Sequence, residues 1–299
     1  MAEGNVILTN TTTLDVWVPS ELISADILQE ARPNMVVANL VQRQFLGAGQ
    51  GKVWEQTQLP TTTAASVAED ADLTAASRTP GKTASITVGE VGLSTEVTDM
   101  ALETSIVGDL AVWARSSGRA IAQKIDGDLC ALFAGLNSTG TGEVGTSGSN
   151  ITVADFIAAI YALELTNAPG QKVCVLHPVQ KMDLMSALTT SSNAAAVFGN
   201  LGELVREGRL PQGVPAAGFW GMLCGVPIYV TTEVDTANTG ADRAGAMFVS
   251  EALTLVQLRP LRVEYQRDAS ARSTEVVATI AYGVGENIDT FGVPLITDA

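Results

Sequence analysis

The sequence contains little of what enzymes and metal sites are usually built from. Its 299 residues include one histidine, His177, and three cysteines, Cys130, Cys174 and Cys224. The cysteines are far apart and form no CxxC pair, so neither a zinc site nor a disulfide framework is expected. Each lies in an apolar context (DLCALF, KVCVLH and MLCGVP), which predicts buried free thiols in a reducing compartment.

Long apolar runs are also missing. No stretch of about 18 apolar residues occurs, so no membrane span is expected. The first ten residues, MAEGNVILTN, lack a basic flank followed by an apolar core, so we expect no signal peptide. Hydrophobic residues nevertheless make up 46% of the chain, which is enough for an ordinary folded core in one large or two smaller domains.

Positive charge is scarce. Lys and Arg number 17 against 32 Asp and Glu, which gives a formal net charge of −15 and an isoelectric point near 4.4. A surface that binds nucleic acid needs clustered Lys and Arg, so this composition argues against one. An acidic chain would suit the wall of a container that must not adhere to packed DNA, although any soluble acidic protein could have the same charge.

Three local patterns imitate functional motifs. The segment TPGKTAS resembles the end of a phosphate-binding loop, but Ala76 stands where the first glycine is needed, and a strand pattern follows. Any Ser-His-Asp or Cys-His site would have to use His177, yet no GxSxG elbow exists, so we expect a strand-end residue. Glu69, Asp70 and Asp72 could hold a cation only loosely. We therefore expect no catalytic, cofactor or metal site.

Residues 52–95 read as a long two-stranded arm. A strand at 52–59 and a returning strand at 83–95 enclose a polar tip. The returning strand changes phase at Gly89, which predicts a β-bulge. A lone two-stranded ribbon is marginal in water, so the arm needs a partner surface, most simply another copy of the chain. Self-assembly is therefore a better first hypothesis than catalysis.

The arm leads into a predicted long helix. Thr98 and Asp99 offer helix-start chemistry, and apolar residues follow at spacings of mainly three and four until Gly135. Such a helix would be on the order of 50 Å long at 1.5 Å per residue. Gly108 and Gly118 lie inside it and are candidate flex points, because glycine weakens a helix interior. Close packing would explain these two glycines equally well.

Shorter elements flank the arm and the helix. Before the arm, we expect helices at 21–31 and 34–45. Beyond the long helix, the pattern predicts a loop at 137–150, a helix at 153–165, a buried strand at 172–178, a helix after Pro178, a mostly irregular region at 199–218, a strand at 222–234 with a turn at Gly225, and a hairpin at 262–283 that turns near 268–272.

This order of elements resembles the major capsid protein of tailed bacteriophages. The most specific local matches are VGEVGLSTEVTDMALETS running into the long helix, VCVLHP followed by a helix, and LCGVPIYVTTEV. The resemblance covers nearly the whole chain. It implies an α+β fold with an extended N-arm at 1–51, a long β-hairpin E-loop at 52–95, the P-domain spine helix and following loop at 96–150, a mixed α/β A-domain mainly at 151–258, and P-domain β-strands with the C-terminal β-hairpin at 259–299.

The resemblance also implies a function. The chain would be a non-enzymatic subunit that assembles into hexamers and pentamers of an icosahedral shell around phage double-stranded DNA. Implied partners are other copies of the chain, a portal and a separate scaffolding protein, with a decoration protein as a further candidate. The location would be the virion capsid, assembled in the host bacterial cytoplasm. Because the E-loop would lie across a neighbouring subunit, we expect intersubunit contacts at Trp54, Arg78, Ile86 and Val88.

Other functions stay open at this point. An encapsulin-type nanocompartment shell protein shares the fold and encloses cargo enzymes. A hydrolase that uses His177 belongs to a different class, and an extended surface adhesin is disfavoured by the expected lack of a signal peptide. The arm tip at 61–79 contains no lysine, so the E-loop isopeptide link of some relatives would lack its amine, and shell closure should be noncovalent.

Overall fold

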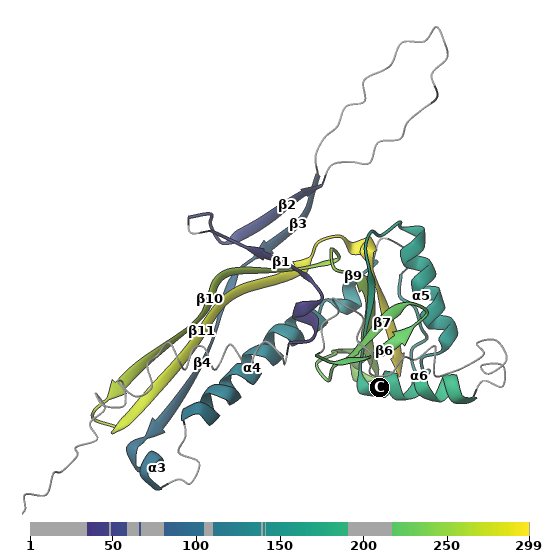
Figure 1. Ribbon diagram of the computed structural model, residues 1–299. Coiled ribbons are helices and arrows are strands. Elements are labelled where there is room, and N and C mark those ends of the chain that lie inside the picture. The colour runs from purple at the N-terminus through teal and green to yellow at the C-terminus, as the bar shows by residue number, and fades with distance from the viewer. Residues whose placement is uncertain are drawn as a thin grey trace, which may run out of the picture.

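The computed structural model describes residues 35–47, 49–58, 66, 81–104, 110–138, 140, 142–190 and 217–298 of the chain. They form an elongated molecule. A compact α/β part lies at one end, a long curved sheet extends from it, and a narrow arm projects to one side (Figure 1). Arg78, Gly108 and the predicted helix at 21–31 lie outside the described residues.

The long curved sheet, the blade, has its strands in the order β1-β10-β11-β4. They are β1 Gln42–Phe45, β10 Leu253–Asp268, β11 Ser273–Glu286 and β4 Gly89–Thr98. β1 runs parallel to β10, and the other neighbouring pairs are antiparallel. The predicted final hairpin and its turn near 268–272 are confirmed. Its first strand starts earlier than expected, so the first residues of β10 belong to the blade although they were expected in the A-domain.

The arm is a separate two-stranded sheet in which β2 Val53–Gln58 pairs antiparallel with β3 Gly81–Thr87. The returning strand predicted at 83–95 is divided between two sheets, because β4 begins at Gly89 and pairs with β11. The predicted β-bulge is therefore wrong: the change of phase marks the passage of the chain from the arm to the blade. Residues 89–95, expected in the E-loop hairpin, lie in the blade.

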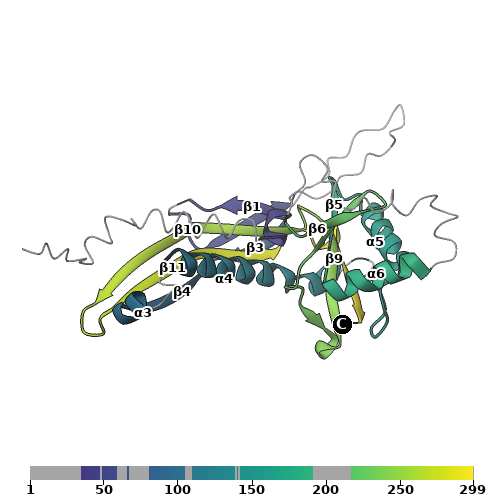
Figure 2. The same cartoon turned by 60° about the horizontal axis from the view of Figure 1, so that its bottom comes forward.

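The range predicted to be one long helix contains two helices, α3 Asp99–Thr104 and α4 Leu110–Cys130, followed by a 3-10 turn, η2 Phe133–Gly135. Residues 105–109 between the helices lie outside the described part. α4 runs along one face of the blade (Figure 2). Its buried residues Ile121, Ile125 and Leu129, spaced by four, join one core cluster with apolar residues of the blade. Gly118 is buried in α4, and its role as a flex point stays a prediction.

The segment 34–45, predicted to be a helix, begins instead with a short hook. The single 3-10 turn η1 Val37–Asn39 lies in it, and β1 starts directly afterwards. We call residues 35–41 the N-terminal hook; its apolar side chains are buried. The helix prediction is wrong because a short apolar run can pack equally well as a turn and a strand once other elements cover it.

The compact part is built on a second sheet with the strand order β12-β9-β5-β7-β6, next to the helices α5 and α6 (Figure 1). The strands are β5 Lys172–Leu176, β6 Phe219–Leu223, β7 Val226–Val230, β8 Thr236–Ala237, which pairs with β9, β9 Asp242–Val249 and β12 Gly292–Asp298. The helices are α5 Val153–Leu165 and α6 Pro178–Thr190, with 3-10 turns η3 Asn238–Gly240 and η4 Asp289–Phe291. The predictions for 153–165, 172–178 and the helix after Pro178 are confirmed.

The last strand departs from the expectation that residues 259–299 stay with the P-domain. β12 pairs with β9 in the compact sheet and not with the blade. Gln180 of α6 fastens these two strands. Its buried side-chain amide donates to the carbonyl oxygens of Arg243 and Leu295, both at 3.0 Å, and to the Thr297 hydroxyl at 2.9 Å. The compact part is therefore completed by a strand from beyond the blade.

The cysteines follow the prediction in two cases of three. Cys130 and Cys174 are buried free thiols, whereas Cys224 is exposed. Cys224 and Gly225 form the turn between β6 and β7, with φ of 51° and 82°. A two-residue turn with both φ values positive suits the twist of an antiparallel hairpin. The apolar neighbours of Cys224 in the sequence belong to the two strands and not to the turn that carries it.

Two glycines of β11 form the seat on which the arm rests. A Cβ atom at Gly285 would lie 2.6 Å from Ile86 Cγ1, and one at Gly283 would lie 2.6 Å from the carbonyl oxygen of Thr87. Ile86, in β3, is 3% exposed. The arm therefore crosses β11 at a distance that requires residues without a side chain.

We predict that Gly285→Ala destabilises the unassembled subunit by about 1–3 kcal/mol, the usual cost of overpacking a core, because Ile86 must move. Urea unfolding measures the change. Gly89→Ala is the matched control, since a Cβ there meets nothing within 4 Å. In an Ile86→Ala background, Gly285→Ala should lower the free energy of unfolding much less than it does in the wild type. Equal effects of Gly285→Ala and Gly89→Ala would contradict the close packing of the arm on Gly285.

Candidate assembly site

The predicted contact residues gather where the arm meets the blade. An apolar cluster, the arm-root cluster, forms there from Leu46, Ile86, Val88, Val256 and Ala281, with Trp54 and Leu258 packed against it. Trp54 lies opposite Ile86 in the pairing of β2 with β3. The structure therefore brings Trp54, Ile86 and Val88 together, while Arg78 lies outside the described residues.

These residues differ in how much of each side chain is exposed, and therefore in whether a neighbouring subunit can contact them. Ile86 and Val88 are 3% and 6% exposed in the single chain. They hold the arm on its own subunit and leave little surface for a neighbour. Trp54 is half-buried, so part of its side chain stays accessible. An intersubunit contact remains a prediction for Trp54, whereas packing within one chain already explains the apolar character of Ile86 and Val88.

Helix α5 exposes a second apolar surface. The helix begins with a capping box, in which Thr152 and Asp155 each bond the other's backbone N–H. Ile157, Tyr161 and Leu165, spaced by four and hence on one side of the helix, are 47%, 60% and 54% exposed. We call this stripe the outer face of α5. The opposite side is buried in the compact core through Phe156, Ala159, Ala162 and Leu163. A helix that is apolar all round is usually covered on every side.

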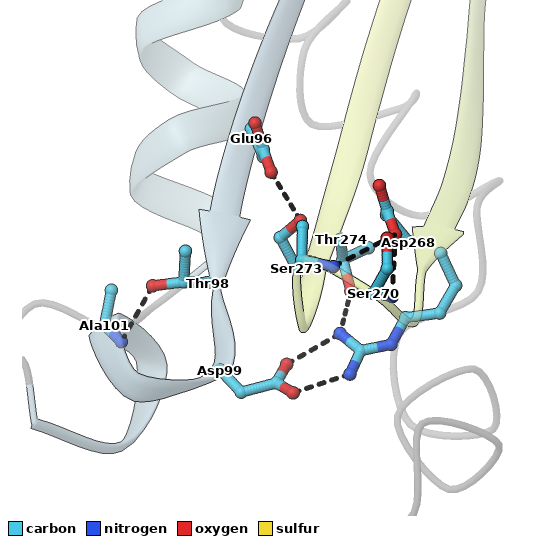
Figure 3. Close-up of polar contacts among 10 residues, drawn as sticks. Glu96, Thr98, Asp99, Ala101, Asp268, Ser270, Ser273 and Thr274 are labelled. Carbon is cyan, nitrogen blue, oxygen red and sulfur yellow. Dashed lines mark hydrogen bonds and ion pairs between the residues drawn. The ribbon is translucent and has the colours of Figure 1, made fainter.

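Polar contacts fix the far end of the blade (Figure 3). Arg267 of β10 donates to both carboxylate oxygens of Asp99, at 2.7 Å and 2.5 Å. The Ser273 hydroxyl donates to Glu96, which lies on the neighbouring strand β4. These contacts join the β10–β11 turn to the end of β4 and the start of α3.

The charges at this end influence each other. The hydrogen bonds from Arg267 hold the pKa of Asp99 below its usual value, and Asp99 raises the pKa of Arg267. A carboxylate with a depressed pKa contributes stability at neutral pH and loses it as the pH falls through that pKa. Both side chains are partly open to solvent, which screens the pair, so its main effect is to orient the two segments.

His177 takes part in the start of α6. Its Nδ1 accepts a hydrogen bond from the backbone N–H of Val179 at 3.3 Å, and its own backbone N–H donates to Gln180 Oε1 at 3.1 Å. Burial, followed by the charge of Arg243, lowers the pKa of His177. The ring is therefore neutral at pH 7 and serves as a hydrogen-bond acceptor for the helix, which fits the strand-end residue predicted from the sequence.

The described ranges lack two kinds of feature. Within them, no group of three or more His, Cys, Asp or Glu residues could hold a metal ion. No helix in the same ranges is both long enough and apolar enough to cross a membrane. The acidic residues Glu69, Asp70 and Asp72 of the arm tip lie outside the described part.

Three features of the site were not predicted from the sequence. The outer face of α5 had a signal, because VADFIAAIYALEL is apolar at more positions than one buried face requires. The seat of the arm had a weak signal, since Gly283 and Gly285 alternate within a strand. No local signal pairs Asp99 with Arg267, because they come together only when the blade folds.

Comparison with solved structures finds the same architecture in phage proteins, capsids among them. A chain of the cyanophage P-SCSP1u capsid matches with a TM-score of 0.64 and 16% identity over 88% of each chain. A chain from Mycobacterium phage Che8 matches at 0.62 and 19% over 87% of this chain and 90% of that one. The capsid of Ralstonia phage GP4 matches at 0.65 and 11% over 88% of both. The predicted α+β capsid fold is confirmed.

Comparison of the sequence with known families points in the same direction as the fold. No curated protein sequence is significantly similar to the chain. The model of a family described as phage capsid protein, however, matches residues 81–293, well over half of the chain. The matched region runs from the returning strand of the arm through the blade and most of the compact part. The chain therefore belongs to the phage capsid protein family.

Proposed function

We propose that this protein is a major capsid protein that assembles into the hexamers and pentamers of an icosahedral shell around phage double-stranded DNA. The observation that carries the proposal is the family match over residues 81–293. The shared fold supports it, since the described phage structures each match at least 87% of this chain. The projecting arm supports it as well, because a two-stranded ribbon is marginal without a partner surface.

The proposal extends to location and partners. The subunit belongs in the virion capsid and is assembled in the host bacterial cytoplasm with a separate scaffolding protein and a portal. A decoration protein is a further candidate. The net charge of −15 suits a wall that encloses DNA without adhering to it.

The competing functions have less support. The family match favours a phage capsid over an encapsulin-type nanocompartment, although both are shells. A hydrolase based on His177 is disfavoured, because its Nδ1 already accepts the Val179 N–H at the start of α6. We therefore propose a structural protein without enzymatic activity.

Electron microscopy of the purified protein tests this function. We expect closed shells or ring-shaped capsomers, because a projecting two-stranded arm is marginal without a partner surface. Denatured particles should give a single band near the chain mass of 31.1 kDa, because the shell is closed without covalent links. A protein that stays monomeric at every concentration would contradict the proposal, and shells filled with one host enzyme would favour the nanocompartment.

We further propose that the outer face of α5 is covered by a neighbouring copy of this chain. Copies that each carry a net charge of −15 repel one another, so they approach most easily through uncharged surfaces. No charged residue occurs between Asp155 and Glu164, and the exposed Ile157 and Tyr161 lie in this uncharged stretch. Exposed apolar stripes of this kind mark interaction surfaces.

Ile157→Glu tests the outer face of α5. The yield of shells or capsomers should fall by about tenfold or more, because an unpaired carboxylate in an apolar contact is costly. The subunit should keep its circular dichroism spectrum, since Ile157 is already half-exposed. Gln171→Glu adds the same charge at an exposed position outside α5 and should assemble normally. Normal assembly of Ile157→Glu would exclude the α5 contact while leaving the capsid function standing.

A further inference from the structure

The N-terminal hook is held by a buried carboxylate of α4. The backbone N–H of Val36 donates to Asp126 Oδ2 at 2.6 Å, and that of Ala38 donates to Asp126 Oδ1 at 2.9 Å. Asp126 is 1% exposed and Ala38 is fully buried, so water cannot replace these bonds. Val36 and Asp126 are 90 positions apart in the sequence, so the contact joins two distant segments.

The other end of the hook is held as well. Arg43 donates from Nε to the carbonyl oxygen of Ala38 at 2.8 Å and from a terminal nitrogen to Asn39 Oδ1 at 2.7 Å. The 3-10 turn η1 thus has a carboxylate at its free N–H groups and a guanidinium at its carbonyl end. This is the arrangement of charges that complements a helical turn.

The hook lies where three parts of the subunit meet. Val37 belongs to the same core cluster as Ile125 of α4 and Leu255 of β10. A Cβ atom at Gly218, just before β6, would lie 2.9 Å from the side chain of Val36. The hook therefore contacts α4, the blade and the compact part, and a displacement of any of them would act on it.

A carboxylate is a costly residue for this position. Burial raises the pKa of Asp126; the hydrogen bonds from the hook oppose this rise, and the charge of Glu233 adds to it. An apolar residue would fill a buried position without that cost. What the carboxylate supplies, and an apolar residue cannot, is two acceptors directed at two particular N–H groups. The geometry thus indicates that Asp126 determines where the hook lies on α4.

We propose that Asp126 is a positioning residue: its carboxylate fixes the N-terminal hook, residues 35–41, on α4 at the place where α4, the blade and the compact part meet. The consequence for shells rests on the proposed capsid function. The contact itself is a property of the single subunit and can be tested without any shell.

Hydrogen exchange of the Val36 and Ala38 amides in the unassembled full-length subunit tests the contact. Asp126→Ala should speed their exchange by about ten- to a hundredfold, the factor expected from losing hydrogen bonds to a charged group. Asp126→Asn keeps the size and one acceptor, so its effect should lie between wild type and Asp126→Ala. This milder variant also decides the question if Asp126→Ala does not fold.

Asp128→Asn is the matched control. It removes one negative charge from the same helix two residues away, where Asp128 accepts a hydrogen bond from the Tyr282 hydroxyl at 2.7 Å. It should leave exchange in the hook unchanged. Unchanged exchange in the Asp126 variants would overturn the proposal, and so would an equal acceleration by Asp128→Asn, which would point to general loosening of α4.

Particle formation tests the consequence for assembly. Asp126→Asn should lower the yield of closed shells relative to both wild type and Asp128→Asn. If the hook loosens but shells form at the wild-type yield, the positioning role is overturned. If the wild type itself forms no particles, the capsid function fails, and the exchange rates of Val36 and Ala38 still decide whether Asp126 holds the hook.

Discussion

The pairing of β11 with a strand on each side holds the extended part of the subunit together. β10 and β4 bond to its two edges. The arm rests on its glycines, Gly283 and Gly285, and α4 is tied to it by the Tyr282 hydroxyl. A narrow sheet has little apolar surface to bury, so its stability depends on a central strand that is covered from several directions. The other contacts of the blade can form only when β11 is in place.

Elements with strong local signals could be predicted from the sequence. The helix at 153–165 has a capping box and a long apolar run, and the turn near 268–272 separates two strand-like segments. The prediction began the final hairpin at residue 262, whereas β10 starts at Leu253 and runs through Pro260. A proline is tolerated there because β1 pairs with β10 only at Thr254–Gln257, and beyond that point this edge of β10 has no hydrogen-bonded neighbour in the described sheet.

Features that depend on distant partners could not be predicted. Alternation shows that 83–95 is extended, but it does not show that the partner strand changes at Gly89. The same holds for β12, whose pairing with β9 is decided by the whole fold. At the candidate site, the proximity of Trp54 to Ile86 follows from the pairing of the two arm strands. The burial of Ile86 by its own chain, in contrast, depends on glycines about 200 positions away.

The place of β12 has a consequence for how a subunit is made. β9 is bordered by β5 on one side and by β12 on the other, and the blade hairpin is translated between β9 and β12. Until the ribosome has released 292–298, the second side of β9 presents unpaired backbone groups, which readily recruit strands of other chains. A truncated product would remain in that state. Pairing of 292–298 with β9 thus covers, late in synthesis, a strand edge that would otherwise be open to the strands of neighbouring chains.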